Sequence, residues 1–205
     1  RGYTRDEVQS IATKALEPAG IIILVTGAGG ALEALLQLGL EAVVLVGGEL
    51  GDEIDLAALE RGLRADPTIA ERLILEITES SAMLMPDLVT VFMADMQARG
   101  ICFALDDFGA GYTAFRYLKD FYFDIIKIDG QFIRGVANNP DNQVLAQALV
   151  SIARHFDMFT VAESVETAED ARYLIDIGFD CLQGYYYGVP STEAPWLSSR
   201  LSRQA

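Results

Sequence analysis

The sequence predicts an α/β fold in which a parallel sheet closes into a modified TIM-type (β/α) barrel with a shortened or rebuilt N-terminal part. Short, almost wholly apolar segments alternate with amphipathic ones, and the connections between them are brief. This alternation is typical of buried parallel strands joined by helices. Polar residues also end five successive apolar segments in the second half. Convergence of many strand ends on one point is typical of a barrel mouth and favours a barrel. An open doubly wound sheet is the alternative fold.

The elements are expected in the following order. A first helix begins after Thr4, which can cap it together with Glu7 in a capping box, and it ends before Pro18. Asn139 and Pro140 start a later helix, because proline suits the first helical position. The seven expected strands are 21–25, 43–46, 72–78, 101–106, 124–129, 159–163 and 181–185. The expected helices are 6–16, 31–38, 55–64, 86–99, 114–119, 140–156 and 168–177, followed by a closing helix.

Composition narrows the class of protein. Hydrophobic residues make up 51% and charged residues 22% of the 205 positions, which predicts a globular chain. A formal net charge of −15 argues against a nucleic-acid polymer as partner, because phosphate contacts need a basic face. The two cysteines form no CxxC motif and favour a reducing, cytoplasmic setting. No apolar run reaches the ~18 residues of a membrane span, so no membrane contact is expected.

The polar strand ends suggest a metal site. They supply Glu76, Asp106 with Asp107, Lys127, Glu163 and Gln183. Clustered carboxylates raise one another's pKa, so they need a cation to remain ionised together. Oxygen ligands without histidine or cysteine select Mg²⁺, Mn²⁺ or Ca²⁺, and a pair of such ions can clamp a phosphodiester and activate a water. Lys127 could orient that water, and Glu163 or Glu166 could relay its proton.

The same residues lie in five motifs that follow one another between positions 63 and 190. They are Leu75-Glu-Ile-Thr-Glu-Ser80, Asp106-Asp-Phe-Gly-Ala-Gly-Tyr112, Ile126-Lys-Ile-Asp129, Val161-Ala-Glu-Ser-Val-Glu-Thr167 and Gln183-Gly-Tyr-Tyr-Tyr187. In order and spacing they resemble the EAL-domain family. The resemblance implies a modified TIM barrel that hydrolyses the bacterial second messenger cyclic di-GMP to the linear dinucleotide with two Mg²⁺ or Mn²⁺ ions.

The resemblance also implies roles for individual residues. Glu76, Asp106 and Asp107 would be metal ligands, and Lys127 and Glu163 would position and activate the water. The remaining site residues would bind the ligand or support the loop at 107–112; they are Glu79, Gly109, Glu166 and Gln183. Because this loop relates metal binding to dimerisation in the family, the expected partners are cyclic di-GMP, a second copy of the chain and a signalling protein. The chain would be a single domain over 1–205, with a divergent front end at 1–62 and a tail at 191–205.

Two ligands from the front end depart from the family pattern. The family has an asparagine at the end of an early strand, where this chain has Leu45, and a leucine cannot ligate a metal. A literal Glu33-Ala-Leu35 is present, but Gln37 replaces the arginine that should follow it. The short spacing to Leu45 favours reading 31–38 as an ordinary helix with Glu33 on its solvent face. The metal sites would then be unoccupied or reduced to one.

A dinucleotide-binding fold is the alternative for the front end. Gly27-Ala-Gly-Gly30 follows an apolar segment, and Glu49 lies about twenty positions further on, as in a glycine-rich phosphate turn. The third glycine of that pattern would fall at Leu32, so a simple turn is favoured.

Three functions are therefore compared. The favoured one is a degenerate EAL domain in cyclic di-GMP signalling that binds the dinucleotide or a protein partner with little or no hydrolysis. The second is an active metal-dependent phosphodiesterase. The third is a structural interaction module, against which the retained second-half carboxylates argue. The setting expected for each is the bacterial cytoplasm, within a larger multidomain protein.

Overall fold

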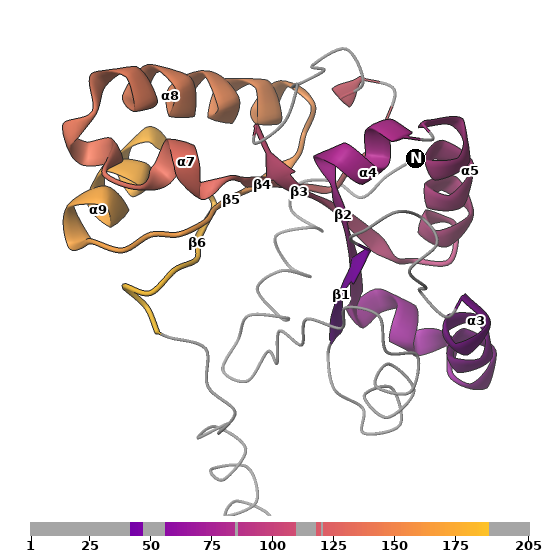
Figure 1. The fold of residues 1–205 in the computed structure, drawn as a ribbon. Coiled ribbons are helices and arrows are strands. Elements are labelled where there is room, and N and C mark those ends of the chain that lie inside the picture. The colour runs from indigo at the N-terminus through magenta and orange to yellow at the C-terminus, as the bar shows by residue number, and fades with distance from the viewer. Residues whose placement is uncertain (1–41, 47–55, 85, 110–117, 120, 189–205) are drawn as a thin grey trace, which may run out of the picture.

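The computed structural model describes residues 42–46, 56–84, 86–109, 118–119 and 121–188. Within these residues one six-stranded parallel sheet has the order β1-β2-β3-β4-β5-β6 (Figure 1). The strands are β1 (Ala42–Val46), β2 (Leu73–Thr78), β3 (Cys102–Phe108), β4 (Ile125–Ile128), β5 (Phe159–Ala162) and β6 (Cys181–Leu182). A spatial order equal to the chain order has no reversal point, which distinguishes a barrel from a doubly wound sheet. The predicted α/β, TIM-barrel-like class is confirmed.

Helices join successive strands. The longer ones are α3 (Leu56–Ala65), α5 (Pro86–Gln97), α8 (Pro140–His155) and α9 (Ala168–Ile177), close to the predicted ranges. Four short elements were not predicted: α4 (Glu79–Leu84), α7 (Gly130–Ile133) and the 3₁₀ helices at Pro67–Arg72 and Val136–Asn138. They are too short to show a helical period in the sequence. The elements expected at 6–16, 21–25, 31–38 and beyond 190, and most of 114–119, lie outside the described residues.

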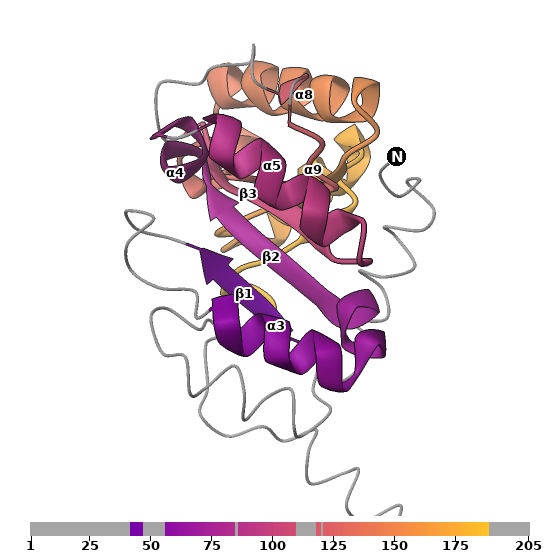
Figure 2. The same cartoon turned by 90° about the vertical axis from the view of Figure 1, so that its right-hand side faces the viewer.

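The two faces of the sheet differ in what they pack against. One face shares a large apolar core with the helices, to which Phe103 and Ile126 of the strands and Met93 and Leu149 of the helices belong. Figure 2 shows α5 and α3 against this side of the sheet. The alternate residues of the strands form a second, smaller cluster without helix residues: Ile74, Cys102, Ala104, Ile125 and Phe159. Since side chains alternate along a strand, this second face also carries Glu76, Asp106 and Lys127.

Local signals in the sequence explain the ends of the later elements. Asn139 caps α8 by accepting hydrogen bonds from the backbone N–H groups of Asp141 and Asn142, and Pro140 follows it. Thr167 caps α9 in the same way, through Asp170 N–H. The last strand is shorter than the predicted 181–185. Gln183 still bonds the neighbouring segment, since its N–H donates to the Ala162 carbonyl, and Tyr187 N–H then closes a turn by donating to the Gly184 carbonyl.

Within the described part of the chain, every helix is too short or too polar to cross a membrane.

Candidate functional site

The carboxyl ends of β2, β3, β4 and β5 bring four of the predicted site residues together. The Lys127 ammonium on β4 lies 3.0 Å from Glu76 Oε2, 2.7 Å from Asp106 Oδ1 and 2.7 Å from Glu163 Oε1. Glu76, Asp106 and Lys127 are buried and Glu163 is half-buried. These three carboxylates and Lys127 therefore form an ion-pair network on the sheet's second face, in which Lys127 is the counter-charge. We use the name acidic cluster below for Glu76, Asp106, Asp107 and Glu163.

A β-bulge brings Asp107 to the same side as Asp106. Leu105 pairs with Ile126 and Phe108 with Ile128, so two residues of β3 stand opposite Lys127 alone. In a regular strand adjacent aspartates would face opposite sides of the sheet. Here Asp107 has a left-handed backbone with φ of 54°, and Phe108 returns to the helix-covered core. The bulge re-aims the exposed Asp107 side chain, as bulges near functional sites commonly do. Consequently carboxylate oxygens of Asp106, Asp107 and Glu163 lie within 4.8 Å of one another.

Gly109, directly after the bulge, is held from three sides. Its N–H donates to Glu79 Oε2 at 3.0 Å, and its carbonyl accepts from Gln131 Nε2 at 2.7 Å. Its φ is 96°, and the Phe132 ring occupies the space that a side chain at this position would need. Glu79 thus binds Gly109, while the rest of the predicted loop lies outside the described residues, and Gln131 is a second contact that the sequence reasoning missed.

Gly109→Ala is expected to destabilise the protein by about 1–3 kcal/mol and to weaken Mn²⁺ binding. The added methyl both strains a left-handed backbone and overlaps the Phe132 ring, so the bulge that presents Asp107 must shift. Urea denaturation and a Mn²⁺ titration measure the two effects.

The matched control is Gly135→Ala. Gly135 also has a positive φ, of 68°, but an added methyl there meets nothing within 4 Å. It should cost only the backbone strain and leave Mn²⁺ affinity unchanged. Equal losses of Mn²⁺ affinity in both variants would contradict the role given to Gly109.

Burial and like charge shape the ionisation of the acidic cluster. Burial raises the pKa of Glu76 from 4.5 to about 7; Lys127 opposes this rise and Asp106 adds to it. Burial likewise raises the pKa of Glu163 against the opposing effect of Lys127. Burial, together with the Asp106 charge, raises the pKa of Asp107. For Lys127, burial alone would lower the pKa, but the Glu76, Glu163 and Asp106 charges outweigh it and raise the pKa. Lys127 therefore stays protonated, and the carboxylates are short of positive charge.

The raised pKa of Glu76 predicts a stability that falls as pH rises. A carboxyl with a higher pKa in the folded state holds its proton longer, so its contribution is complete below pH 4.5 and is lost as pH rises through about 7. In EDTA, the wild type should lose up to about 3 kcal/mol relative to Glu76→Gln between these limits. Denaturation of both proteins at pH 4.5, 6 and 8 measures the difference. Parallel pH profiles of the two proteins would show that Glu76 is not the titrating group.

The donor set fits a divalent metal ion. Asp106, Asp107 and Glu163 each offer a carboxylate oxygen within one small volume, and these hard oxygen ligands suit Mg²⁺, Mn²⁺ or Ca²⁺. Among the described residues, Lys127 is the ammonium group within 4 Å of these carboxylates, so a cation would relieve the like-charge repulsion that adds to burial in raising the pKa values of Glu76, Asp107 and Glu163.

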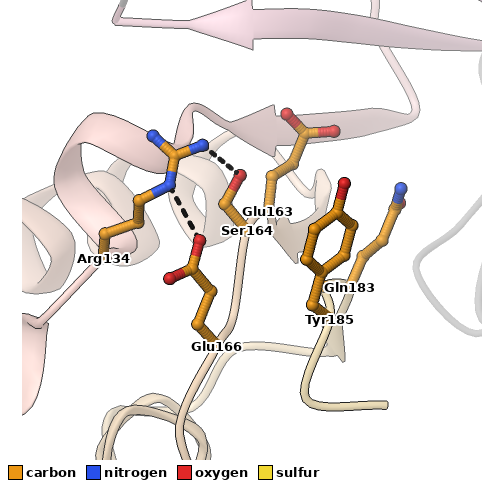
Figure 3. A pocket seen from close by; sticks show the side chains of 7 residues that line it. Arg134, Glu163, Ser164, Glu166, Gln183 and Tyr185 are labelled. Atoms are coloured by element: carbon orange, nitrogen blue, oxygen red, sulfur yellow. Dashed lines mark hydrogen bonds and ion pairs between the residues drawn. The ribbon is translucent and has the colours of Figure 1, made fainter. Parts of the chain in front are cut away.

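A pocket opens beside the acidic cluster and shares Glu163 with it (Figure 3). It has a volume of about 250 Å³ and is lined by Arg134, Glu163, Ser164, Glu166, Gln183, Gly184 and Tyr185. The predicted residues Glu163, Glu166 and Gln183 are thus brought together. Sequence reasoning missed Arg134 and Tyr185. The signal that could have found Arg134 is a basic residue in the connection that follows the Lys127 strand.

The register of β1 places Leu45 next to this site. Leu45 is the parallel-sheet partner of Glu76, and Glu76 is the partner of Ala104 on β3. The sheet position beside the first glutamate of the acidic cluster is therefore held by a residue without a ligand atom. Glu33 and Gln37 lie outside the described residues.

A parallel sheet in chain order, with acidic residues and a lysine at its carboxyl edge, defines a TIM-barrel-like protein with a candidate divalent-metal site. The chain belongs to the EAL domain family, whose model matches residues 9–190.

Similar proteins agree with this assignment. The chain is 33% identical over 171 residues to a Pseudomonas aeruginosa protein named bifunctional diguanylate cyclase/cyclic di-GMP phosphodiesterase MucR, covering 83% of this chain and 24% of that protein. It thus spans about a quarter of this curated relative. The solved cyclic di-GMP complex of the PaMucR phosphodiesterase has a TM-score of 0.70 at 29% identity, over 78% of this chain and 75% of that one. A manganese and cyclic di-GMP complex of Klebsiella pneumoniae BlrP1 has a TM-score of 0.65 at 26% identity, over 76% and 41%.

Proposed function

We propose that this chain is a single EAL domain that binds cyclic di-GMP through a divalent ion, with little or no hydrolysis, and acts as a receptor in bacterial signalling. The observation that carries the proposal is the pairing of Leu45 with Glu76 beside an otherwise intact acidic cluster. MucR and BlrP1, whose structures hold cyclic di-GMP, support the choice of ligand. The expected setting is the cytoplasm, with a second copy of the chain or a signalling protein as partner.

In this proposal each site residue has a defined task. Asp106 and Asp107 would hold Mg²⁺ or Mn²⁺ together with Glu163, which lies close to them, or with Glu76, and the ion would supply positive charge against a phosphodiester. Lys127 neutralises Glu76 and Asp106. In any remaining hydrolysis Lys127 would orient the water and Glu163 would accept its proton. Glu166 and Gln183 contact the dinucleotide, and Glu79 and Gly109 support the bulge. A leucine beside Glu76 leaves one ligand fewer on that side, which weakens a second metal position.

An active phosphodiesterase is the second candidate. The close approach of Asp106, Asp107 and Glu163, with Lys127 among them, favours it, because these groups would serve hydrolysis as well as binding. A purely structural interaction module agrees less well with the site. Buried carboxylates with raised pKa values lower the stability of the fold, and a module without a ligand would have no function for them.

Calorimetric titration with cyclic di-GMP, with and without Mn²⁺, tests binding. The expected result is metal-dependent binding that Asp106→Ala abolishes. Chromatography of the products after incubation in Mn²⁺ then separates receptor from enzyme. Formation of linear dinucleotide by the wild type at rates typical of enzymes, about 1 s⁻¹ or more, and its loss in Asp106→Ala, would replace the receptor by the phosphodiesterase.

A further inference from the structure

Helix α7 contacts the bulge of β3 through two neighbouring residues, and both act on Gly109. The Gln131 side chain donates from Nε2 to the Gly109 carbonyl at 2.7 Å. The Phe132 ring occupies the place that a side chain at position 109 would need. Gln131 is an exposed residue, yet its amide takes a backbone carbonyl of the bulge as its acceptor. Helix α7 therefore fixes both the carbonyl and the bare Cα of Gly109.

The backbone of Gln131 is itself held at both of its polar groups. Its N–H donates to Asp129 Oδ1 at 2.8 Å, and its carbonyl accepts from Asn142 Nδ2 at 3.0 Å. Asn142 lies in the first turn of α8, where its own N–H donates to the capping residue Asn139 at 3.2 Å. Helix α8 lies beside α7 (Figure 1) and packs into the core through Leu149. The Gln131 side chain thus extends to the bulge from a backbone that is anchored to α8.

The bulge needs such support because its conformation is unfavourable without a metal ion. Asp107 and Gly109 both have left-handed backbones, with φ of 54° and 96°, and a residue with a Cβ adopts this conformation at a cost. The bulge also brings carboxylate oxygens of Asp107, Asp106 and Glu163 within 4.8 Å of one another, where like charges repel. A contact that favours the bulge therefore raises the fraction of molecules that can bind the ion, and the apparent affinity rises with that fraction.

We propose that Gln131 is a positioning residue that keeps Asp107 turned toward the other carboxylates of the acidic cluster, and that Asn142 acts through Gln131 from α8. The inference rests on the proposed function, which supplies the divalent ion. Both residues act on the backbone of Gly109, two positions after Asp107, and neither is a metal ligand. The first turn of α8 is thereby connected to the metal site by two successive hydrogen bonds.

Calorimetric titration with Mn²⁺ alone, without a dinucleotide, is the first test. Gln131→Met keeps the length of the side chain and removes its N–H donors. It should weaken Mn²⁺ binding by about 3- to 10-fold, the range expected for one neutral hydrogen bond. Asn142→Ala should also weaken Mn²⁺ binding, although alanine favours the helix and so does not unfold it. The double variant should bind no more weakly than Gln131→Met, because Asn142 acts through Gln131; additive losses would contradict that order.

Amide hydrogen exchange of the protein in EDTA gives a second readout that needs no metal. The Gly109 N–H is protected by its bond to Glu79, and opening of the bulge releases it. Exchange at Gly109, followed by NMR, should be faster in Gln131→Met than in the wild type by about the same factor as the loss of Mn²⁺ affinity.

Gln143→Met is the matched control. Gln143 Nε2 donates to the Val136 and Ala137 carbonyls at 3.0 Å each, so it fastens the connection between α7 and α8 instead of the bulge. This substitution also removes a bond from a glutamine amide to the backbone. It should lower stability but leave both Mn²⁺ affinity and the exchange at Gly109 unchanged.

The outcomes separate this inference from the function on which it rests. If the wild type binds Mn²⁺ and Gln131→Met stays within about twofold of it in both readouts, the proposed function stands and the role of Gln131 is wrong. Equal losses in Gln131→Met and Gln143→Met also overturn that role, because general loosening would then be the cause. If the wild type binds no Mn²⁺, the metal site of the proposed function fails. Exchange at Gly109 then decides alone: faster exchange in Gln131→Met upholds its hold on the bulge, and unchanged exchange overturns it.

Discussion

Lys127→Met is expected to destabilise the metal-free protein by about 3–5 kcal/mol at pH 8, the largest stability effect of any single substitution in the site. The ammonium contacts Glu76, Asp106 and Glu163 within 3.0 Å, and its removal leaves these three carboxylates without a counter-charge from the described residues. The loss should be smaller at pH 5, where Glu76, with its pKa of about 7, is already protonated. Urea denaturation in EDTA at both pH values measures these differences.

Two comparisons test the cause of that loss. The double variant Lys127→Met, Glu76→Gln should be less destabilised than Lys127→Met alone, since one of the uncompensated charges is gone. Saturating Ca²⁺ should restore part of the stability, because a bound cation replaces the lysine charge. Lys119→Met removes an exposed lysine and should stay within about 0.5 kcal/mol of the wild type. A loss in Lys127→Met that neither pH nor Glu76→Gln changes would point to packing instead of charge.

Leu45→Asn is expected to tighten Mn²⁺ binding by about 10- to 100-fold and to raise the production of linear dinucleotide by at least a comparable factor. Asparagine adds an amide oxygen at the sheet position next to Glu76, where the wild type has no ligand atom. A second metal position would then be complete enough for hydrolysis, which depends on both ions. Calorimetry with Mn²⁺ and chromatography of the reaction products measure the two gains.

Val44→Asn is the matched control on the same strand. Val44 pairs with Leu75, which belongs to the core shared with the helices, so this substitution should give no gain. A gain in Val44→Asn but not in Leu45→Asn would show that the strand register differs from the one that places Leu45 beside Glu76. No gain in either variant, with both folded, would remove Leu45 as the reason for weak hydrolysis.

The sequence by itself determined much of the fold and the membership of the acidic cluster. Short apolar strands separated by amphipathic helices specify a parallel sheet, because only such strands are buried on both faces. Caps such as Asn139 and Thr167 set the starts of two helices, since their signals are local. Glu76, Asp106, Lys127 and Glu163 could be grouped because parallel strands end at one edge. By contrast α4 and α7 were missed, because one or two turns carry too few residues to show a period.

Tertiary structure alone decided how the site is arranged. Adjacent aspartates in a strand point to opposite faces, so the sequence Asp106-Asp107 gives no reason for both to reach one metal. The bulge opposite Lys127 brings both aspartates to one side of the sheet. Contacts from Glu79 and Gln131, which are distant in the sequence, to Gly109 support the bulge. The ion pair between Arg134 and Glu166 in the pocket wall likewise joins segments that lie 32 positions apart in the printed sequence. Such features depend on strand register and on contacts between residues far apart in the sequence. A local sequence pattern cannot predict which residues these contacts join.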